Sequence, residues 1–251
     1  MTVVEIAMKS DIGCVRQVNE DYGTHFTILD KYTGVILADG MGGHLAGDVA
    51  SKMAVEVICH EIQSLLEEEI TVDEIRINTE HAIKKANDKI LDYASRHQEC
   101  AGMGTTVVVG ILRKGWGLIA YIGDSRAYQF TLGHLKRLTD DHSLVNELVK
   151  SGQITAKEAD DHPQRNVLLR ALGTDKHVTI DFVPVSFQER DIFLICSDGL
   201  TKMVPDKEIE KILNQRISLQ EMADQLVERA KEAGGDDNIT VILLRESQPN
   251  G

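Results

Sequence analysis

The chain has 251 residues, and its 40 acidic and 27 basic side chains give a formal net charge of −13 at pH 7. Phosphate backbones and anionic lipids repel such a surplus, so we expect neither nucleic acid nor a membrane surface as a partner. Hydrophobic residues make up 42% of the chain, which is enough for a sizeable core, and no apolar run approaches the length of a membrane span.

The chain shows no proline- or serine-rich linker, no low-complexity tract and no repeat of fixed period. We therefore expect a single domain over residues 2–245, followed by a short polar tail over residues 246–251. The first residues, MTVVEIAMKSDIG, lack the pattern of a signal peptide. The four cysteines form no CxxC pair, so reduced, buried thiols in a cytoplasmic protein are the simplest interpretation. Nothing suggests an obligate interface, and we expect a monomer.

The first half of the chain predicts strands followed by two long helices. A loosely alternating strand at residues 2–8 precedes a polar segment, SDIGCVRQVNEDYG, whose composition is typical of a loop. Two strands at residues 25–29 and 35–38 follow, and then apolar residues at helical spacing over residues 49–66. A capping box at Thr71 and Glu74 begins a second helix that extends to about His97. Two consecutive long helices indicate an antiparallel pair laid on a sheet.

The second half predicts short antiparallel strands and two further helices. The strands are expected at residues 105–112, 118–122, 126–130, 135–138, 178–183, 191–196 and 238–244. Helical patterns occur at residues 206–213 and after a second capping box at Ser218 and Glu221. Residues 140–173 interrupt the strands with polar turns and a short helical pattern, and we interpret them as a flap. The order is not alternating βαβ, so it favours an α+β fold with antiparallel sheets covered by helices.

Four aspartates share one setting at the ends of predicted strands. Asp39 follows VILA, Asp124 follows LIAYIG, Asp198 follows FLICS, and Asp237 immediately precedes NITVILL. Any single aspartate of this kind is more often a turn former, because Asp-Gly and Asp-Asn are common turn dipeptides. Their recurrence makes a shared site the hypothesis to test, and Glu20 and Asp21 in the polar segment are further candidates.

Converging carboxylates of this number need a cation to stay ionised together, because like charges raise one another's pKa. Ligation by carboxylates, carbonyls and water indicates a hard divalent ion such as Mg²⁺ or Mn²⁺. Two such ions can share a carboxylate and activate a water between them for attack on phosphorus. Gly40 can offer a backbone carbonyl, since glycine permits close approach and positive φ. Arg16 can bind a phosphate as a planar fork.

Other routes to phosphate chemistry lack their motifs. No cysteine has an arginine six residues further on, so a cysteine-phosphatase loop is absent. The chain has no GxxxxGK[ST] and no HExxH, and the glycines at 102 and 104 lack the third glycine of a dinucleotide fingerprint.

Six short motifs occur together and in a familiar order. They are RQVNED from Arg16, ADGMGG from Ala38, GTT from Gly104, GDSR from Gly123, SDGL from Ser197 and GDDNIT from Gly235. With these motifs the chain resembles the metal-dependent protein serine/threonine phosphatases of the PPM family, type 2C, in their compact bacterial form. The resemblance covers nearly the whole chain, and it implies a four-layer αββα sandwich of two antiparallel sheets flanked by helix pairs.

The resemblance also implies roles for the acids. Asp39 would bridge two Mn²⁺ or Mg²⁺ ions, Gly40 would give a carbonyl, and Asp198 and Asp237 would complete the second ion. These three aspartates would carry catalysis.

Further ligands would act less directly. Glu20 and Asp21 would act through waters, and Arg16 would hold the substrate phosphate. Bacterial members often carry a third ion, which matches Asp124 with help from Asp198.

The implied function is hydrolysis of phosphoserine and phosphothreonine on proteins, opposing a eukaryotic-like serine/threonine kinase in bacterial signalling. One position departs from relatives in higher organisms, because Met41 stands where they place a histidine proposed as the general acid. Two alternatives stay open from the residues alone: a non-catalytic phosphoprotein-binding module on the same fold, and a phosphodiesterase or nuclease. The acidic composition counts against the latter.

Overall fold

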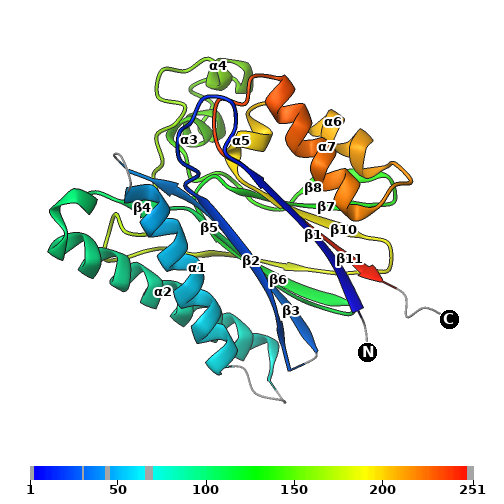
Figure 1. The fold of residues 1–251 in the computed structure, drawn as a ribbon, viewed down its shortest axis with the longest axis horizontal. Helices are drawn as coiled ribbons and strands as arrows, with labels where there is room; N and C mark the ends of the chain where they lie inside the picture. Colours follow the sequence, from blue (N-terminus) through cyan, green and yellow to red (C-terminus); the bar gives the residue numbers. More distant parts are fainter. Residues whose placement is uncertain (1–2, 30, 43–45, 66–69, 248–251) are drawn as a thin grey trace.

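The computed structural model describes residues 3–29, 31–42, 46–65 and 70–247. Two antiparallel sheets stack face to face, with helices on both outer faces (Figure 1). This arrangement is the predicted αββα sandwich, so the fold class is confirmed. In the described part of the chain, no helix has the length and apolar character that a membrane crossing requires.

The first sheet joins the two ends of the described chain. Its strands are β1 (Val3–Asp11), β11 (Ile239–Ser247), β10 (Ile192–Cys196), β7 (Arg126–Thr131) and β8 (His134–Arg137), in that spatial order. Strands β1 and β11 pair along their whole length, from Val3 opposite Ser247 to Asp11 opposite Ile239. The polar tail predicted from residue 246 therefore begins inside this strand, and residues 248–251 lie outside the described part.

The second sheet has the order β2 (Asp21–Ile28), β3 (Tyr32–Met41), β5 (Val107–Arg113), β6 (Trp116–Ile122) and β9 (Asp181–Val185), with β4 (Gly104–Thr105) also paired to β3. Alternation along β3 decides which core each side chain joins. Val35 and Leu37 pack between the two sheets, whereas Ile36 and Ala38 face the helices. The strand is buried on both faces, which explains its continuous apolar run.

Each sheet has its own helical cover. The second sheet packs against α1 (Ala46–Leu65) and α2 (Val72–Arg96), which a 3₁₀ turn η1 (Gln98–Cys100) follows. The first sheet packs against α5 (Asp198–Thr201), α6 (Asp206–Leu213) and α7 (Leu219–Glu232). Both predicted capping boxes are present, at Thr71 with Glu74 and at Ser218 with Glu221. The predicted helices are thereby confirmed to within a few residues.

Three further sequence expectations differ from the structure. The polar loop is shorter than expected, because β1 extends to Asp11 and β2 already begins at Asp21. The strand expected at residues 178–183 lies at Asp181–Val185, where it pairs with β6. The cysteines are unpaired as expected, but Cys14 is exposed and Cys59 is half-buried, so the prediction of uniformly buried thiols is wrong.

Residues 140–173 stand outside both sheets, as the flap interpretation requires. They contain α3 (Leu144–Lys150) and α4 (Ala156–Asp160), and they lie above the end of the sandwich (Figure 1). A third capping box, between Thr155 and Glu158, begins α4 and was not predicted. Isolated bridges between Ser143 and Leu168, and between Thr105 and Leu172, close the base of the flap.

Candidate metal and phosphate site

The predicted acids lie together at one edge of the sandwich, where strands of both sheets end. Asp21 is the first residue of β2 and stands directly opposite Asp39 near the end of β3. Asp198 follows the end of β10, and Asp237 lies just before β11. Because the two sheets stack, these strand ends meet beside the corner between β6 and β7 that carries Asp124.

The carboxylates of this cluster repel one another. Burial raises the pKa of Asp39 well above its ordinary value, and the charges of Asp21, Asp198, Asp124 and Asp237 raise it further. Desolvation also raises the pKa of Asp21, and separately that of Asp124, to about 7. The cluster therefore holds more negative charge than the surrounding protein neutralises.

Buried carboxylate oxygens without partners test whether the cluster suits a cation. Among the described residues, Asp21 Oδ1, Asp198 Oδ1, Glu20 Oε1 and Asp48 Oδ1 are buried and accept no hydrogen bond. Unsatisfied anionic oxygens are costly to bury, and a divalent cation removes that cost. An oxygen-only donor set of this kind fits Mg²⁺ or Mn²⁺. Asp48, in the first turn of α1, was not among the predicted residues.

The carboxylates do not form a closed cage on their own. In the described part of the chain, no three acidic, histidine or cysteine side chains are already placed to hold one ion between them. Asp198 instead pairs with Lys202, and Asp237 pairs with Arg16 at 2.9 Å. An ion bound here would need waters or backbone carbonyls for several of its donor atoms.

Ser197 and Thr240 fix the position of Asp21. Ser197 Oγ donates to Asp21 Oδ2 at 2.7 Å and accepts from the backbone N–H of Thr240 at 2.9 Å. The neighbouring oxygen of Asp21 is one of those without a partner. One oxygen of Asp21 is thus anchored to the protein while the other stays available.

Asn238 holds the loop that carries Arg16 and Glu20. Its side-chain amide donates to the carbonyl oxygens of Ile12 at 2.9 Å and Val18 at 3.0 Å, and its Oδ1 accepts from the N–H of Glu20 at 2.8 Å. The asparagine in the GDDNIT motif therefore ties the loop between β1 and β2 to the start of β11. Sequence reasoning assigned it no role, because its partners are backbone groups far away in the chain.

Gly40 is required by close packing. A Cβ at this position would come within 2.0 Å of the carbonyl oxygen of Gly47 and 2.8 Å of that of Glu20. The φ angle of Gly40 is not positive, so that part of the sequence argument was wrong. Its N–H donates to Glu20 O at 3.0 Å, which brings the Glu20 backbone against the end of β3.

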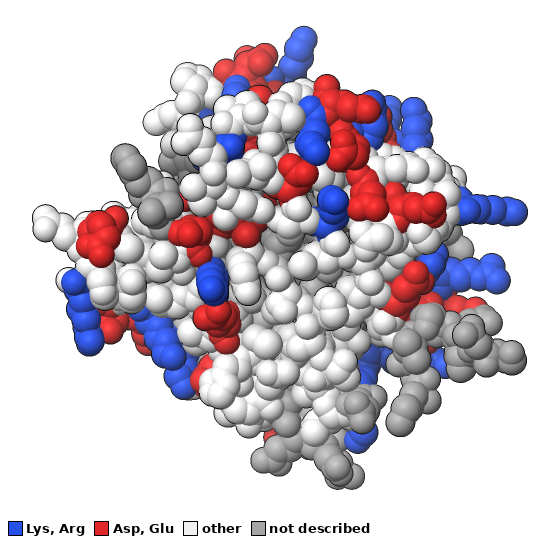
Figure 2. Space-filling model, in the orientation of Figure 1, with Lys and Arg blue, Asp and Glu red and all other residues white. Residues whose placement is uncertain are grey.

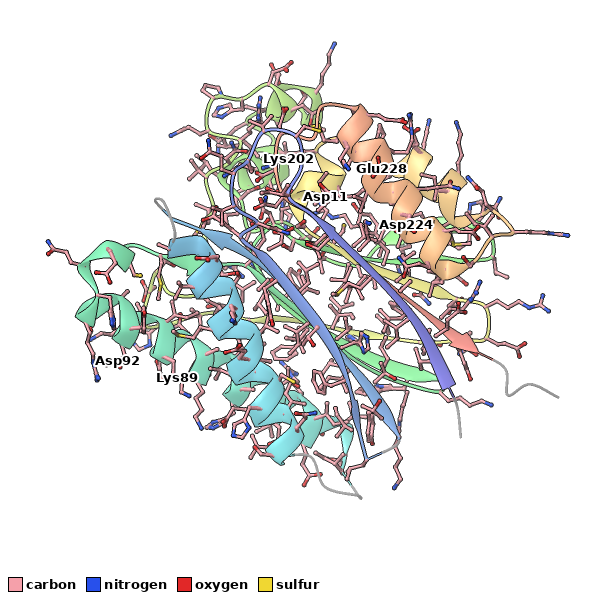
Figure 3. All side chains as sticks on the ribbon, viewed as in Figure 1. Asp11, Lys89, Asp92, Lys202, Asp224 and Glu228 are labelled. Carbon is pink, nitrogen blue, oxygen red and sulfur yellow. The ribbon has the colours of Figure 1, made fainter. Side chains whose placement is uncertain are left out.

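A cavity of about 830 Å³ opens beside the acids and extends under the flap. Arg16, Asp124, Asp198 and Asp237 line one part of it, and flap residues that include Val149 line another. Lys202, labelled in Figure 3, is also among the residues that line this cavity. No histidine is among the described residues that line this cavity.

Lys202 is a further site residue that the motifs did not reveal. It follows α5, four residues after Asp198, so the helical turn brings its ammonium group to the carboxylate. Its pKa is raised: burial lowers it, but the attraction of Asp198 outweighs this. The only sequence feature that could have indicated Lys202 is its helical spacing from Asp198, a predicted ligand.

Comparison with known proteins places the chain in one family. Residues 15–243 match the family model described as protein phosphatase 2C. The chain is 45% identical over 242 residues to the serine/threonine phosphatase stp of Listeria welshimeri, covering 95% of this chain and 94% of that protein. It is also 40% identical to protein phosphatase PhpP of Streptococcus pneumoniae, covering 96% of this chain and 97% of that protein.

Solved structures give the same result. Serine/threonine phosphatase Stp1 from Staphylococcus aureus superimposes with a TM-score of 0.91 at 36% identity, over 98% of this chain and 96% of that chain. The catalytic domain of the phosphatase PstP, in complex with two manganese ions, superimposes with a TM-score of 0.84 at 31% identity, over 99% and 100%. The chain therefore belongs to the protein phosphatase 2C family.

Proposed function

We propose that this chain is a metal-dependent phosphatase that hydrolyses phosphoserine and phosphothreonine on proteins. The observation that carries the proposal is the cluster around Asp39, in which four other aspartates raise its pKa and buried oxygens lack partners. The names of the relatives, serine/threonine phosphatase and protein phosphatase, support the reaction class. The manganese ions in the similar PstP domain support the need for divalent metal.

The proposed ligands are the acids of the strand ends. Asp39, Asp198, Asp237 and the carbonyl of Gly40 would hold two divalent cations, Mn²⁺ or Mg²⁺. When bound, these cations supply positive charge that activates a water for attack on phosphorus and neutralises the phosphoryl oxygens.

Less direct ligands complete this set. Glu20 and Asp21 would act through waters, and Asp124 with Asp198 would take a third ion. The orphaned oxygens of Glu20, Asp21 and Asp198 support their inclusion.

Arg16 is the proposed phosphate ligand. Its guanidinium is on an exposed loop, 2.9 Å from Asp237 and 3.8 Å from Glu20, so it stands at the open rim of the acidic cluster. A planar fork in this place can take two phosphate oxygens and set the phosphorus in line for attack. Asn238 holds the backbone of the loop that carries this guanidinium.

The proposed partners are phosphoproteins, among them a eukaryotic-like serine/threonine kinase and its targets in bacterial signalling. The cavity supports a protein substrate, because its 830 Å³ extends beyond the acids to the surface of the flap. A cytoplasmic location and a monomeric state are parts of the same proposal. The unpaired cysteines support the location, since reduced thiols are typical of the cytoplasm.

The two alternatives are less well supported. A binding module would not need the full set of strand-end acids with their uncompensated charge. A nuclease or phosphodiesterase needs a basic track for its substrate, but Figure 2 shows Lys and Arg interspersed with Asp and Glu on the face that it displays.

A phosphothreonine peptide assay with Asp39→Asn tests the proposal. We expect Mn²⁺-dependent release of phosphate by the wild type, loss of activity in excess EDTA, and at least about a thousandfold lower rate for Asp39→Asn. Circular dichroism of the variant serves as the folding control. Activity of Asp39→Asn at the wild-type rate would contradict the mechanism, and cleavage of a diester as fast as the monoester would favour the diesterase.

A further inference from the structure

His142 is a buried histidine at the start of the flap that the proposed reaction does not use. Its side chain is 6% exposed, and it lies outside the cluster of strand-end acids. Both of its ring nitrogens and both of its backbone polar groups have partners in the described structure. So many contacts at one residue indicate a role in placing its neighbours.

The first set of contacts fixes Gly123, the residue before Asp124. The backbone N–H of His142 donates to Gly123 O at 3.0 Å, and the N–H of Gly123 donates to His142 Nδ1 at 3.1 Å. Gly123 has φ +108°, and a Cβ there would lie 2.6 Å from the side chain of Thr106. His142 therefore holds both backbone groups of a tight corner that aims Asp124 into the cavity.

The second set of contacts joins the two ends of the flap. His142 Nε2 lies 3.0 Å from Asp181 Oδ2 on β9, and Asp181 also pairs with Arg170 Nη1 at 3.4 Å. Arg170 is close to the end of the flap. The N–H of Leu169 donates to the carbonyl oxygen of His142 at 2.8 Å. Through one residue, the start of the flap, its end and β9 are tied together.

The hydrogen bonds determine the protonation state of the ring. Nδ1 must be unprotonated, because it accepts from the N–H of Gly123, so the ring proton lies on Nε2 and is donated to Asp181. The ring also stacks on Tyr121, with centroids 5.1 Å apart and planes inclined by 13°. Burial lowers the pKa of His142 and the nearby charge of Arg170 lowers it further, although the contact with Asp181 opposes this shift; the direction agrees with a neutral ring.

We propose that His142 is a positioning residue that holds the corner bearing Asp124 and the base of the flap in a fixed position relative to each other. The proposal rests on the proposed function, because Asp124 matters only if it faces the reacting metals. It extends that function, because a histidine with no contact to substrate or metal then couples the flap to an outer metal ligand.

Two substitutions separate the contact of His142 with Gly123 from its contact with Asp181. His142→Asn keeps an oxygen near the position of Nδ1, so it can accept from Gly123 but does not reach Asp181. His142→Gln reaches Asp181 but has no acceptor at the Gly123 N–H. A purely structural role for the buried ring predicts similar effects of both changes.

Metal-free protein gives the readouts that do not depend on activity. The ¹⁵N NMR signals of wild-type His142 should show an unprotonated Nδ1 and a protonated Nε2. Hydrogen exchange of the Gly123 amide should become about tenfold or more faster in His142→Gln and stay close to the wild type in His142→Asn, since a lost buried hydrogen bond allows local opening.

Phosphatase assays over a range of Mn²⁺ concentrations complete the test. For His142→Gln we expect half-maximal activity to require about tenfold more Mn²⁺, with most of kcat regained at saturation, whereas His142→Asn should keep the wild-type requirement. A protonated Nδ1, or equal shifts of exchange and Mn²⁺ requirement in both variants, would overturn the proposal. Failure of the proposed function would remove the activity readout but leave the NMR and exchange results decisive for the placement of the corner.

Discussion

Two acidic regions border the same cavity and differ in how their charge is balanced. At the strand ends, Asp21 and Asp198 each keep one buried oxygen without a partner. At the base of the flap, both oxygens of Asp141 are occupied, since Arg126 binds them at 3.0 and 2.7 Å and Arg137 binds one of them. The strand-end acids therefore carry uncompensated negative charge, whereas arginines neutralise the charge of Asp141 at the base of the flap.

The difference separates residues that serve binding from residues that serve the fold. An acid that arginines already satisfy gains little from a metal, and its loss leaves cations without a partner. An acid that repels its neighbours weakens the metal-free fold and gains most when a cation arrives. Charge balance therefore distinguishes acids that composition and motifs treat alike.

Among single substitutions, the largest expected effect on stability comes from Asp141→Asn, which should lower the free energy of unfolding by about 2 kcal/mol because Arg126 and Arg137 lose their partner. Urea denaturation in EDTA measures it. Asp140→Asn in the same flap is the matched control, since its exposed pair with Lys150 should contribute less than about 1 kcal/mol. Equal effects of the two substitutions would remove the distinction between the two regions.

A second effect is the pH dependence of the metal-free protein. The pKa of Asp21 and that of Asp124 are raised to about 7 by burial, so the folded state binds more protons than the unfolded state. Their stabilising contribution is complete below about pH 4 and is lost as the pH rises through 7. The lowered pKa of His142 acts in the opposite direction but involves one group.

The free energy of unfolding in EDTA should therefore fall by about 2 kcal/mol per pH unit between pH 5 and 7, about half of it from each group. Urea denaturation at four pH values measures the slope. Asp39→Asn should reduce the slope, because it removes one of the repelling charges, and Mn²⁺ should reverse the loss near neutral pH. A metal-free protein that becomes more stable from pH 5 to 7 would show that ionisation of the strand-end acids does not destabilise the folded state.

The smallest effect tests whether Arg16 serves the substrate or only its acidic neighbours. Arg16→Lys keeps the positive charge beside Asp237 but loses the planar fork. We expect about a tenfold higher KM for a phosphopeptide and an unchanged free energy of unfolding, because the side chain is exposed. An unchanged KM would limit Arg16 to pairing with Asp237 and Glu20.

The sequence predicted most of the fold because its signals are local. The continuous apolar run of β3, the stripe of α1 and two capping boxes each lie within one element. The strand-end aspartates were also recognisable, since each follows or precedes an apolar run. Their convergence, however, depends on how the sheets stack, and it was inferred from recurrence and from a resemblance.

The missed residues act across long distances in the chain. His142 contacts Gly123 and Asp181, and Asn238 contacts Ile12 and Val18. Such a partner has no fixed spacing in sequence, so pattern reasoning cannot assign it. The break between β4 and β5 also could not be predicted from local sequence. It falls at Thr106, whose N–H donates to Asp39 O at 2.9 Å.

The pairing of β1 with β11 has a consequence for folding of the enzyme during its synthesis on the ribosome. Because Asp11 pairs with Ile239, β1 cannot pair with its neighbour in the sheet until β11 has been synthesised. Asp237 and Asn238, beside that last strand, complete the acidic cluster and hold the Arg16 loop. Contacts so distant in sequence form late in folding. A nascent chain therefore carries its first proposed metal ligands long before the cluster is complete, and we expect activity only after β11 has been synthesised.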